Sequence, residues 1–281
     1  MKRVALINDL SGLGRCSLTA ALPVLSVMGV QPCAMPTAVL TNQTGYPSFT
    51  IQNYTPCVAD YVADWKKAGM TFDAISTGFL TSEQQVEDIH CFLKAFRRPE
   101  SFLLVDPIMG DDGDRYPSYS EALCARITEL AMQADVVTPN LTEACLLTGA
   151  NYREVIQAPS LLQRAAELGQ DLRQKGIGTV VITGIKQNDH LTNLVIDATG
   201  VHEISSPCVG GSYSGTGDLL ASVLCGGLLT GATATEAVEL ATRFIVAALN
   251  DTVAAGSDRN DGVLFEQHLS LLTRLTHKSK D

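Results

Sequence analysis

The sequence lacks long apolar runs and is poor in basic residues. No apolar segment approaches the roughly 20 residues of a membrane-spanning helix, so no membrane partner is expected. Its 20 lysines and arginines are outnumbered by 30 aspartates and glutamates, and the formal net charge at pH 7 is −10. Nucleic-acid binding depends on basic side chains that neutralise phosphates, so the composition argues against a nucleic-acid partner. An anionic nucleotide would instead be bound by backbone donors and a divalent metal.

The eight cysteines form no C-x-x-C pair and are widely spaced along the chain. Several fall within apolar periodic segments, which is typical of reduced, buried thiols rather than of a disulfide framework. The apolar part of the N-terminus, residues 4–7, is too short for a signal peptide. We therefore expect a cytoplasmic protein.

Several catalytic motifs are also missing. There is no G-x-x-x-x-G-K-[ST] motif, no H-R-D with D-F-G, and no G-x-S-x-G. These absences exclude a P-loop kinase, a protein kinase and a serine hydrolase with the usual nucleophile turn. The five histidines are dispersed without zinc-ligand spacing. A dinucleotide-binding oxidoreductase fits poorly as well, because the glycine-rich turn lies near residue 215 and not after the first strand.

Short β-rich apolar runs alternate with longer helical patterns. Strands are predicted at residues 4–7, 30–35, 74–77, 102–106, 136–138, 179–183, 191–197 and 201–205. Helices are predicted at residues 17–28, 57–68, 82–96, 119–133, 142–148, 160–175, 218–229, 235–253 and 264–275. This alternation predicts an α/β fold with a mainly parallel sheet, helices on both faces and a small antiparallel edge formed by the last two strands. No linker or repeat interrupts the pattern, so we expect one domain over residues 1–281.

The most informative segment is Ser214-Gly215-Thr216-Gly217-Asp218, which precedes an apolar helical stretch. Such a turn can direct backbone N–H groups toward an anion at a helix N-terminus. A carboxylate there would be repelled by a bound phosphate, so its presence needs a reason. Either Asp218 is a general base for a hydroxyl that attacks a phosphate, or it caps the helix.

Two further polar clusters follow predicted strands. Asp106 ends one strand, with Asp111 five residues later, and Asn140 precedes Glu143 by three residues after another strand. Oxygen ligands of this kind suit Mg²⁺, which often keeps waters and shares nucleotide phosphates. Alternatively, Asn140 and Glu143 form the capping pair of a helix N-terminus.

Together these residues resemble the vitamin B6 kinases of the ribokinase superfamily over nearly the whole chain. The resemblance is carried by Asn8-Asp9 with Ser11-Gly12-Leu13-Gly14, Thr41-Asn42-Gln43-Thr44-Gly45-Tyr46, Thr77-Gly78-Phe79, Asp106 to Asp111, Thr138-Pro139-Asn140 with Glu143, Val181-Ile182-Thr183, and Gly215-Thr216-Gly217-Asp218. The last motif marks the superfamily, and the T-N-Q-T-G-Y stretch is similar to the S-N-H-T-G-Y of the B6 branch. The implied fold is the ribokinase-like three-layer sandwich.

The resemblance also implies a reaction and a role for each residue. The reaction is ATP-dependent phosphorylation of the 5′-hydroxyl of pyridoxal, pyridoxine or pyridoxamine, with a homodimer as the common assembly. Asp218 would be the base, and Gly215, Thr216 and Gly217 would form the anion hole. The remaining roles are metal binding by Asp106, Asp111 and Glu143, nucleotide binding by Asn140 and Thr183, and substrate binding by Asp9, Thr44 and Phe79. The expected ions are Mg²⁺ and, as an option, a monovalent cation.

Two positions depart from the family pattern, in which serine is frequent at position 9 and tyrosine at position 79. Because both positions would face the substrate, hydroxymethylpyrimidine or its phosphate is the alternative acceptor, as in related kinases of thiamine synthesis. A catalytically silent ligand-binding regulator is a more distant alternative. An intact Asp218, Glu143 and glycine turn argue against it, since a binding protein needs no base.

Overall fold

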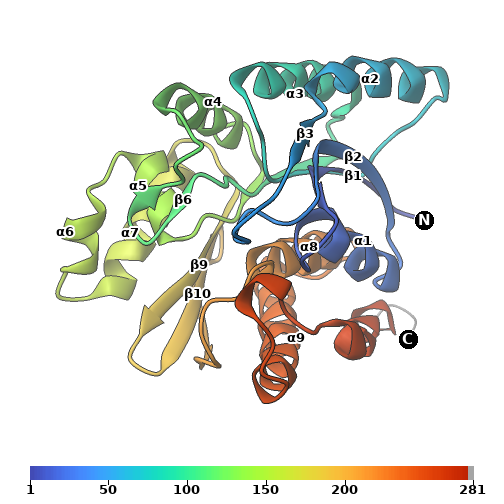
Figure 1. Ribbon diagram of the computed structural model, residues 1–281. Coiled ribbons are helices and arrows are strands. Elements are labelled where there is room, and N and C mark those ends of the chain that lie inside the picture. The colour runs from blue at the N-terminus through green and yellow to red at the C-terminus, as the bar shows by residue number, and fades with distance from the viewer. Residues whose placement is uncertain (278–281) are drawn as a thin grey trace.

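A nine-stranded sheet runs through the centre of the computed structural model, which describes residues 1–277 (Figure 1). The strand order is β11-β10-β9-β8-β5-β4-β1-β2-β3. The strands are β1 (Arg3–Ser11), β2 (Gln31–Leu40), β3 (Ile51–Asn53), β4 (Ala74–Thr77), β5 (Phe102–Val105), β8 (Val136–Val137), β9 (Thr179–Gln187), β10 (His190–Asp197) and β11 (Gly200–Pro207). Parallel pairing joins the central strands β9, β8, β5, β4, β1 and β2, in that order across the sheet. Antiparallel pairing joins β3 to β2 at one edge, and β10 to β9 and β11 to β10 at the other.

Helices cover both faces of this sheet (Figure 1). One face packs against α1 (Ser17–Val27), α8 (Thr216–Leu229), α9 (Ala234–Ala254) and residues of the 3-10 segment η3 (Glu266–His277). The other packs against α2 (Val58–Lys67), α3 (Glu83–Phe96), α4 (Glu121–Ala131), α5 (Leu141–Thr148), α6 (Tyr152–Ile156) and α7 (Leu161–Gln174). The remaining elements are η1 (Thr55–Cys57), η2 (Arg259–Asp261) and the hairpin of β6 (Gly110–Asp111) and β7 (Asp114–Arg115).

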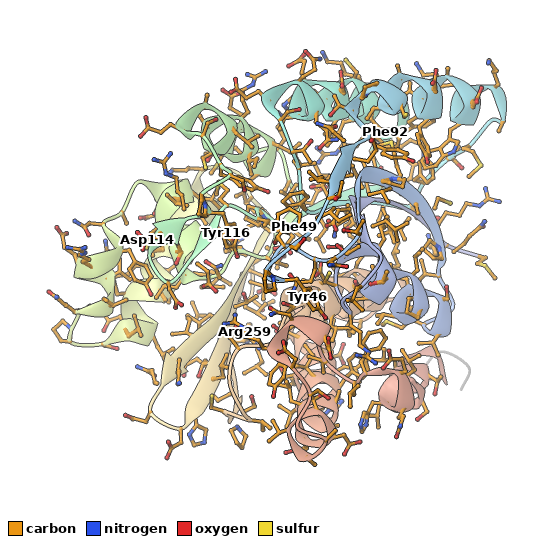
Figure 2. All side chains as sticks on the ribbon, in the orientation of Figure 1. Tyr46, Phe49, Phe92, Asp114, Tyr116 and Arg259 are labelled. Carbon is orange, nitrogen blue, oxygen red and sulfur yellow. The ribbon has the colours of Figure 1, made fainter. Side chains whose placement is uncertain are left out.

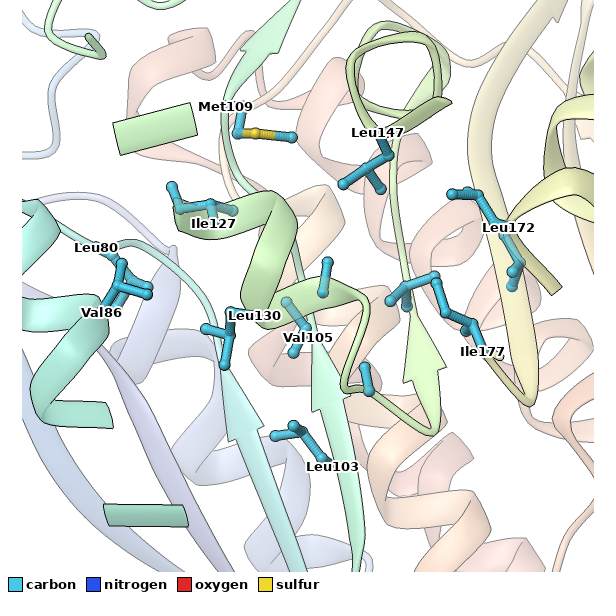
Figure 3. Close-up of a cluster of buried hydrophobic side chains, with 14 of the residues drawn as sticks. Leu80, Val86, Leu103, Val105, Met109, Ile127, Leu130, Leu147, Leu172 and Ile177 are labelled. Carbon is cyan, nitrogen blue, oxygen red and sulfur yellow. The ribbon is translucent and has the colours of Figure 1, made fainter. Parts of the chain in front are cut away.

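The two cores follow from the period-2 alternation of side chains along buried strands. In β1, Val4 and Leu6 enter the core beneath α1 and α8, whereas Ala5 and Ile7 enter the core beneath α3 and α4. Figure 3 shows the core beneath α3 and α4, in which side chains of β5 lie close to Leu130 of α4. Burial on both faces explains why these strands read as continuous apolar runs.

The predicted three-layer α/β fold and its antiparallel edge are confirmed, with differences at several boundaries. The sequence placed Asp9 after a short strand, but β1 continues to Ser11 and β2 continues past Pro36 to Leu40. Between Asn8 and Leu10 the register shifts, because β2 carries one residue more than β1. The predicted α-helix at 264–275 is instead the 3-10 segment η3, and the short elements β3, β6, β7 and α6 were missed.

None of the helices within residues 1–277 combines the length and apolar character needed to cross a membrane. That residues 1–281 form one domain stays a prediction. Residues 278–281 of that predicted domain lie outside the described part of the chain.

Candidate active site

The residues singled out from the sequence follow neighbouring parallel strands. Because β1, β4, β5, β8 and β9 lie side by side, their carboxyl ends form one row, where open α/β sheets bind ligands. Asn8 and Asp9 lie near the end of β1, Phe79 follows β4, and Asp106 follows β5. Asn140 follows β8 and pairs through an isolated parallel bridge with Thr183 of β9. The fold thus brings these segments together.

The glycine turn forms the N-terminus of α8. Gly215 is the N-cap residue with a φ of +83°, and a Cβ there would overlap the carbonyl oxygen of Arg15. The position therefore requires glycine on two grounds, its left-handed backbone and its close approach to another chain segment. Gly217 is exposed, and a Cβ built on it would meet nothing within 4 Å. The first N–H groups of a helix lack intrahelical partners, so this open end can receive an anion.

Asp218 lies in the first turn of α8 but does not cap it, since the N-cap is Gly215 and no side chain caps this helix. The capping interpretation of Asp218 is therefore wrong. Its Oδ1 instead accepts a hydrogen bond of 3.2 Å from Nδ2 of Asn8. Burial, followed by the charge of Asp9, raises the pKa of Asp218 to about 6, although hydrogen bonds from the Ser17 backbone and Asn8 act in the opposite direction. A carboxylate with this pKa is ionised at neutral pH and remains a usable proton acceptor.

Asp9 lies beside Asp218 and is only 5% exposed. Its Oδ2 accepts a 2.9 Å hydrogen bond from the Ser11 hydroxyl, and burial raises its pKa despite hydrogen bonds from Ser17 and Ser11. Ser17 has a φ of +48°, an unusual value for a residue other than glycine. This strained backbone places donors toward both carboxylates, and strain of this kind concentrates at functional sites.

Asn140 and Glu143 form a reciprocal capping box at the start of α5. The Glu143 backbone N–H donates to Asn140 Oδ1 at 2.9 Å, and the Asn140 N–H donates to Glu143 Oε2 at 2.8 Å. The other oxygen of Glu143 accepts from the Met109 N–H at 3.1 Å. The predicted capping pair of Asn140 and Glu143 is thus present in the structure. It leaves a metal role open, because each carboxylate oxygen has more than one acceptor position.

Asp106 is a further acid close to Glu143 of this capping box. Burial, followed by the charge of Asp218, raises the pKa of Asp106 to about 7, while the Thr138 hydroxyl donates to its Oδ1 at 2.9 Å. Burial and Asp106 also raise the pKa of Glu143 well above its ordinary value. Mutual repulsion of this kind indicates a site that would be stabilised by a cation. Within residues 1–277, however, no three His, Cys, Asp or Glu side chains are close enough to hold a metal ion directly.

The remaining predicted residues lie at the margins of this centre. Asp111, in β6, is exposed and its Oδ1 accepts a 2.9 Å hydrogen bond from the Asp112 N–H. The Thr183 N–H donates to the Pro139 carbonyl at 2.9 Å. Thr44 is exposed in the loop after β2. The Phe79 N–H donates to Asn8 Oδ1 at 2.8 Å, and its ring lies edge-on to Tyr119 with centroids 6.0 Å apart.

The segment η2 connects two loops of the site and was not predicted. Gln43 donates from Nε2 to the backbone and side-chain oxygens of Asn260, each at 3.2 Å. The Ser214 N–H donates to the Arg259 carbonyl at 3.1 Å, and the Tyr46 hydroxyl bonds to Asp261. Figure 2 shows Tyr46 and Arg259 near the centre of the molecule. No local pattern signals these contacts, because 217 positions separate Gln43 from Asn260 and 215 separate Tyr46 from Asp261, and Ser214 is also distant in sequence from Arg259.

Comparison with known proteins identifies the family. The sequence model of phosphomethylpyrimidine kinase matches residues 15–262. The chain belongs to the phosphomethylpyrimidine kinase family. The chain is 32% identical over 256 residues to a pyridoxine/pyridoxal/pyridoxamine kinase of Bordetella avium. The match covers 87% of this chain and 83% of that protein.

Two solved structures are similar over nearly the whole chain. A Bacteroides thetaiotaomicron protein assigned to the phosphomethylpyrimidine kinases, in a crystal form with pyridoxal, is 36% identical with a TM-score of 0.90, covering 96% of this chain and 95% of that one. Pyridoxal kinase from Lactobacillus plantarum is 29% identical with a TM-score of 0.88, covering 100% of both chains. The resemblance to vitamin B6 kinases is confirmed, and this family member is a small-molecule kinase.

Proposed function

We propose that the enzyme transfers a phosphoryl group from ATP to the 5′-hydroxyl of a vitamin B6 vitamer. The observation that carries this proposal is Asp218 at the open N-terminus of α8, bonded to Asn8 and with its pKa raised to about 6. The chemistry requires a proton acceptor beside an anion site. The similarity to a protein crystallised with pyridoxal and to B6 kinases supports the choice of acceptor.

Asp218 accepts the proton of the substrate hydroxyl while the hydroxyl oxygen attacks the terminal phosphorus of ATP; the bond from that phosphorus to the bridging oxygen breaks, and ADP leaves. The backbone of Gly215, Thr216 and Gly217 binds the transferred phosphoryl oxygens at the positive end of the helix dipole. The exposed, unobstructed face of Gly217 supports this role.

The substrate ring is bound on the β1 side of the site. Asp9 pairs with a protonated ring nitrogen or an ammonium group, while Phe79 and Thr44 contact the ring. The burial of Asp9 supports such a contact, because a charge-assisted hydrogen bond is stronger in a desolvated setting. The exposed Thr44 lies on the same loop as Tyr46, which bonds to Asp261.

Asp106, Asp111 and Glu143 would hold Mg²⁺ in part through its water molecules, and Asn140 and Thr183 would bind the nucleotide phosphates. The acidic cluster fits a hard cation, and the shortage of direct ligands fits an ion that keeps waters and binds phosphate oxygens. When bound, Mg²⁺ neutralises the phosphate charge that would otherwise repel these carboxylates. A monovalent cation would find the same acidic surroundings. A homodimer is proposed from the family resemblance, and sedimentation analysis would test it.

The description of the matching family favours a second acceptor, hydroxymethylpyrimidine or its phosphate. The decisive experiment measures ADP release with pyridoxal, pyridoxine, pyridoxamine and both pyrimidines in parallel. We expect the highest kcat/KM with a B6 vitamer. A higher value with a pyrimidine would establish the second function, and no transfer to any acceptor would favour a ligand-binding regulator.

A further inference from the structure

Asn8 lies between the proposed base and the substrate side of the site, and all the hydrogen-bonding directions of its carbonyl oxygen are used. That oxygen accepts from the Asp9 N–H at 2.9 Å and from the Phe79 N–H at 2.8 Å. Backbone N–H groups only donate, so they fix which end of the amide is oxygen. The NH₂ end must therefore face Asp218, whose Oδ1 lies 3.2 Å away.

The packing around Asn8 leaves this side chain little freedom. A Cβ at position 78 would come within 2.6 Å of Asn8 Nδ2, so Gly78 is what makes room for the amide. Asn8 and Asp218 both border a cavity of about 20 Å³ that is also lined by Thr77 and Asp106. A volume of this order accepts one water or a shifted carboxylate. The amide is the fixed partner because two backbone N–H groups hold its oxygen, and the carboxylate is the one that needs to be held.

We propose that Asn8 is a positioning residue for Asp218, holding the carboxylate in the orientation in which it receives the proton of the substrate hydroxyl. This inference rests on the proposed function of Asp218. An amide suits this place because it donates to a carboxylate without adding a fourth negative charge beside Asp9, Asp106 and Asp218. The same amide couples the base to the backbone of Phe79, so the base and the proposed ring-binding segment share one anchor.

The cleanest variant is Asn8→Asp, which has the same shape. It keeps the oxygen that accepts from Asp9 and Phe79 but removes the donor that faces Asp218. We expect kcat to fall at least tenfold, while KM for ATP and for the vitamer stays within about twofold. An unchanged kcat in a folded Asn8→Asp protein would overturn the proposal.

A charge-swap cycle tests the contact without relying on activity. Asn8→Asp and Asp218→Asn are each compared with the double variant that carries both changes, and urea midpoints of unfolding are measured. The double variant restores one amide facing one carboxylate, so we expect its midpoint to recover most of the loss caused by Asn8→Asp, while activity stays absent. Additive effects on the midpoint would contradict a direct pairing of the two side chains.

Thr252→Val provides the control for a merely structural effect. Thr252 is fully buried, and its hydroxyl bonds to the Ala248 carbonyl at 2.7 Å and to the Leu264 N–H at 2.9 Å, both outside the site. This variant should lower the unfolding midpoint and leave kcat unchanged. If the wild-type enzyme phosphorylates none of the tested acceptors, the proposed function fails, whereas the urea cycle still decides whether Asn8 holds Asp218.

Discussion

Gly215 lies directly against the carbonyl oxygen of Arg15, which joins the start of α8 to the loop before α1. We expect Gly215→Ala to reduce the free energy of unfolding by at least about 2 kcal/mol, because it combines a left-handed backbone with a steric overlap. Chemical denaturation measures this loss. Gly256→Ala is the matched control, since Gly256 has a φ of +63° but open space around its Cα. Equal losses in the two variants would contradict the close approach to Arg15.

Glu143 is expected to act on the metal as well as on the helix. Glu143→Gln removes one negative charge beside Asp106, so the Mg²⁺ concentration that gives half-maximal rate should rise severalfold. Magnesium titration of the initial rate provides the measurement. Glu236→Gln, in the capping box of α9 away from the acids, should leave that titration unchanged. An unaltered titration in Glu143→Gln would show that Glu143 only caps α5.

Asp9 should distinguish between vitamers. Hydrogen bonds to charged groups contribute about 1.5–3 kcal/mol, so loss of an ammonium contact corresponds to roughly a tenfold or larger effect. Asp9→Ser is expected to raise KM more for pyridoxamine than for pyridoxine, with a smaller change in kcat. Steady-state kinetics with both vitamers tests this. Equal increases would leave only the ring nitrogen as a partner, and no increase in the folded variant would remove Asp9 from the substrate site.

The pH dependence of kcat/KM should report the base. Burial and the charge of Asp9 raise the pKa of Asp218 to about 6, and only its ionised form accepts a proton. At constant saturating Mg²⁺, kcat/KM should therefore fall about tenfold per pH unit below about pH 6. A plateau that extends down to pH 4.5 would contradict the raised pKa of the base.

The layers, and the segments that meet at the carboxyl ends of the parallel strands, could be predicted because their signals are local. Continuous apolar runs such as residues 4–7 indicate strands buried on both faces, and the glycine turn at 215–217 indicates a helix N-terminus. The hydrogen bond from Asn8 to Asp218 and the bonds from Gln43 to Asn260 could not be found this way, because the partners lie 210 and 217 positions apart. The extension of β2 was missed because Pro36 signals a strand end, whereas here the ladder continues across a register shift.

The difference between local and distant partners also explains why the capping prediction is correct at the start of α5 and wrong at the start of α8. Asn140 and Glu143 are three residues apart, so their capping box is written in the local sequence, and the structure contains it. Asp218 follows a similar local pattern, yet its side chain bonds to Asn8 from a distant strand. Tertiary packing, and not the local pattern, decides whether such a side chain caps its own helix.

The most direct test of the account is the kcat of Asp218→Asn with the preferred B6 vitamer. The amide has the shape of the carboxylate but accepts no proton, and general-base catalysis contributes about 10²–10⁴-fold. We predict that kcat falls by at least about two orders of magnitude while nucleotide binding is largely retained. A folded Asp218→Asn enzyme with near wild-type kcat would contradict the assignment of Asp218 as the base.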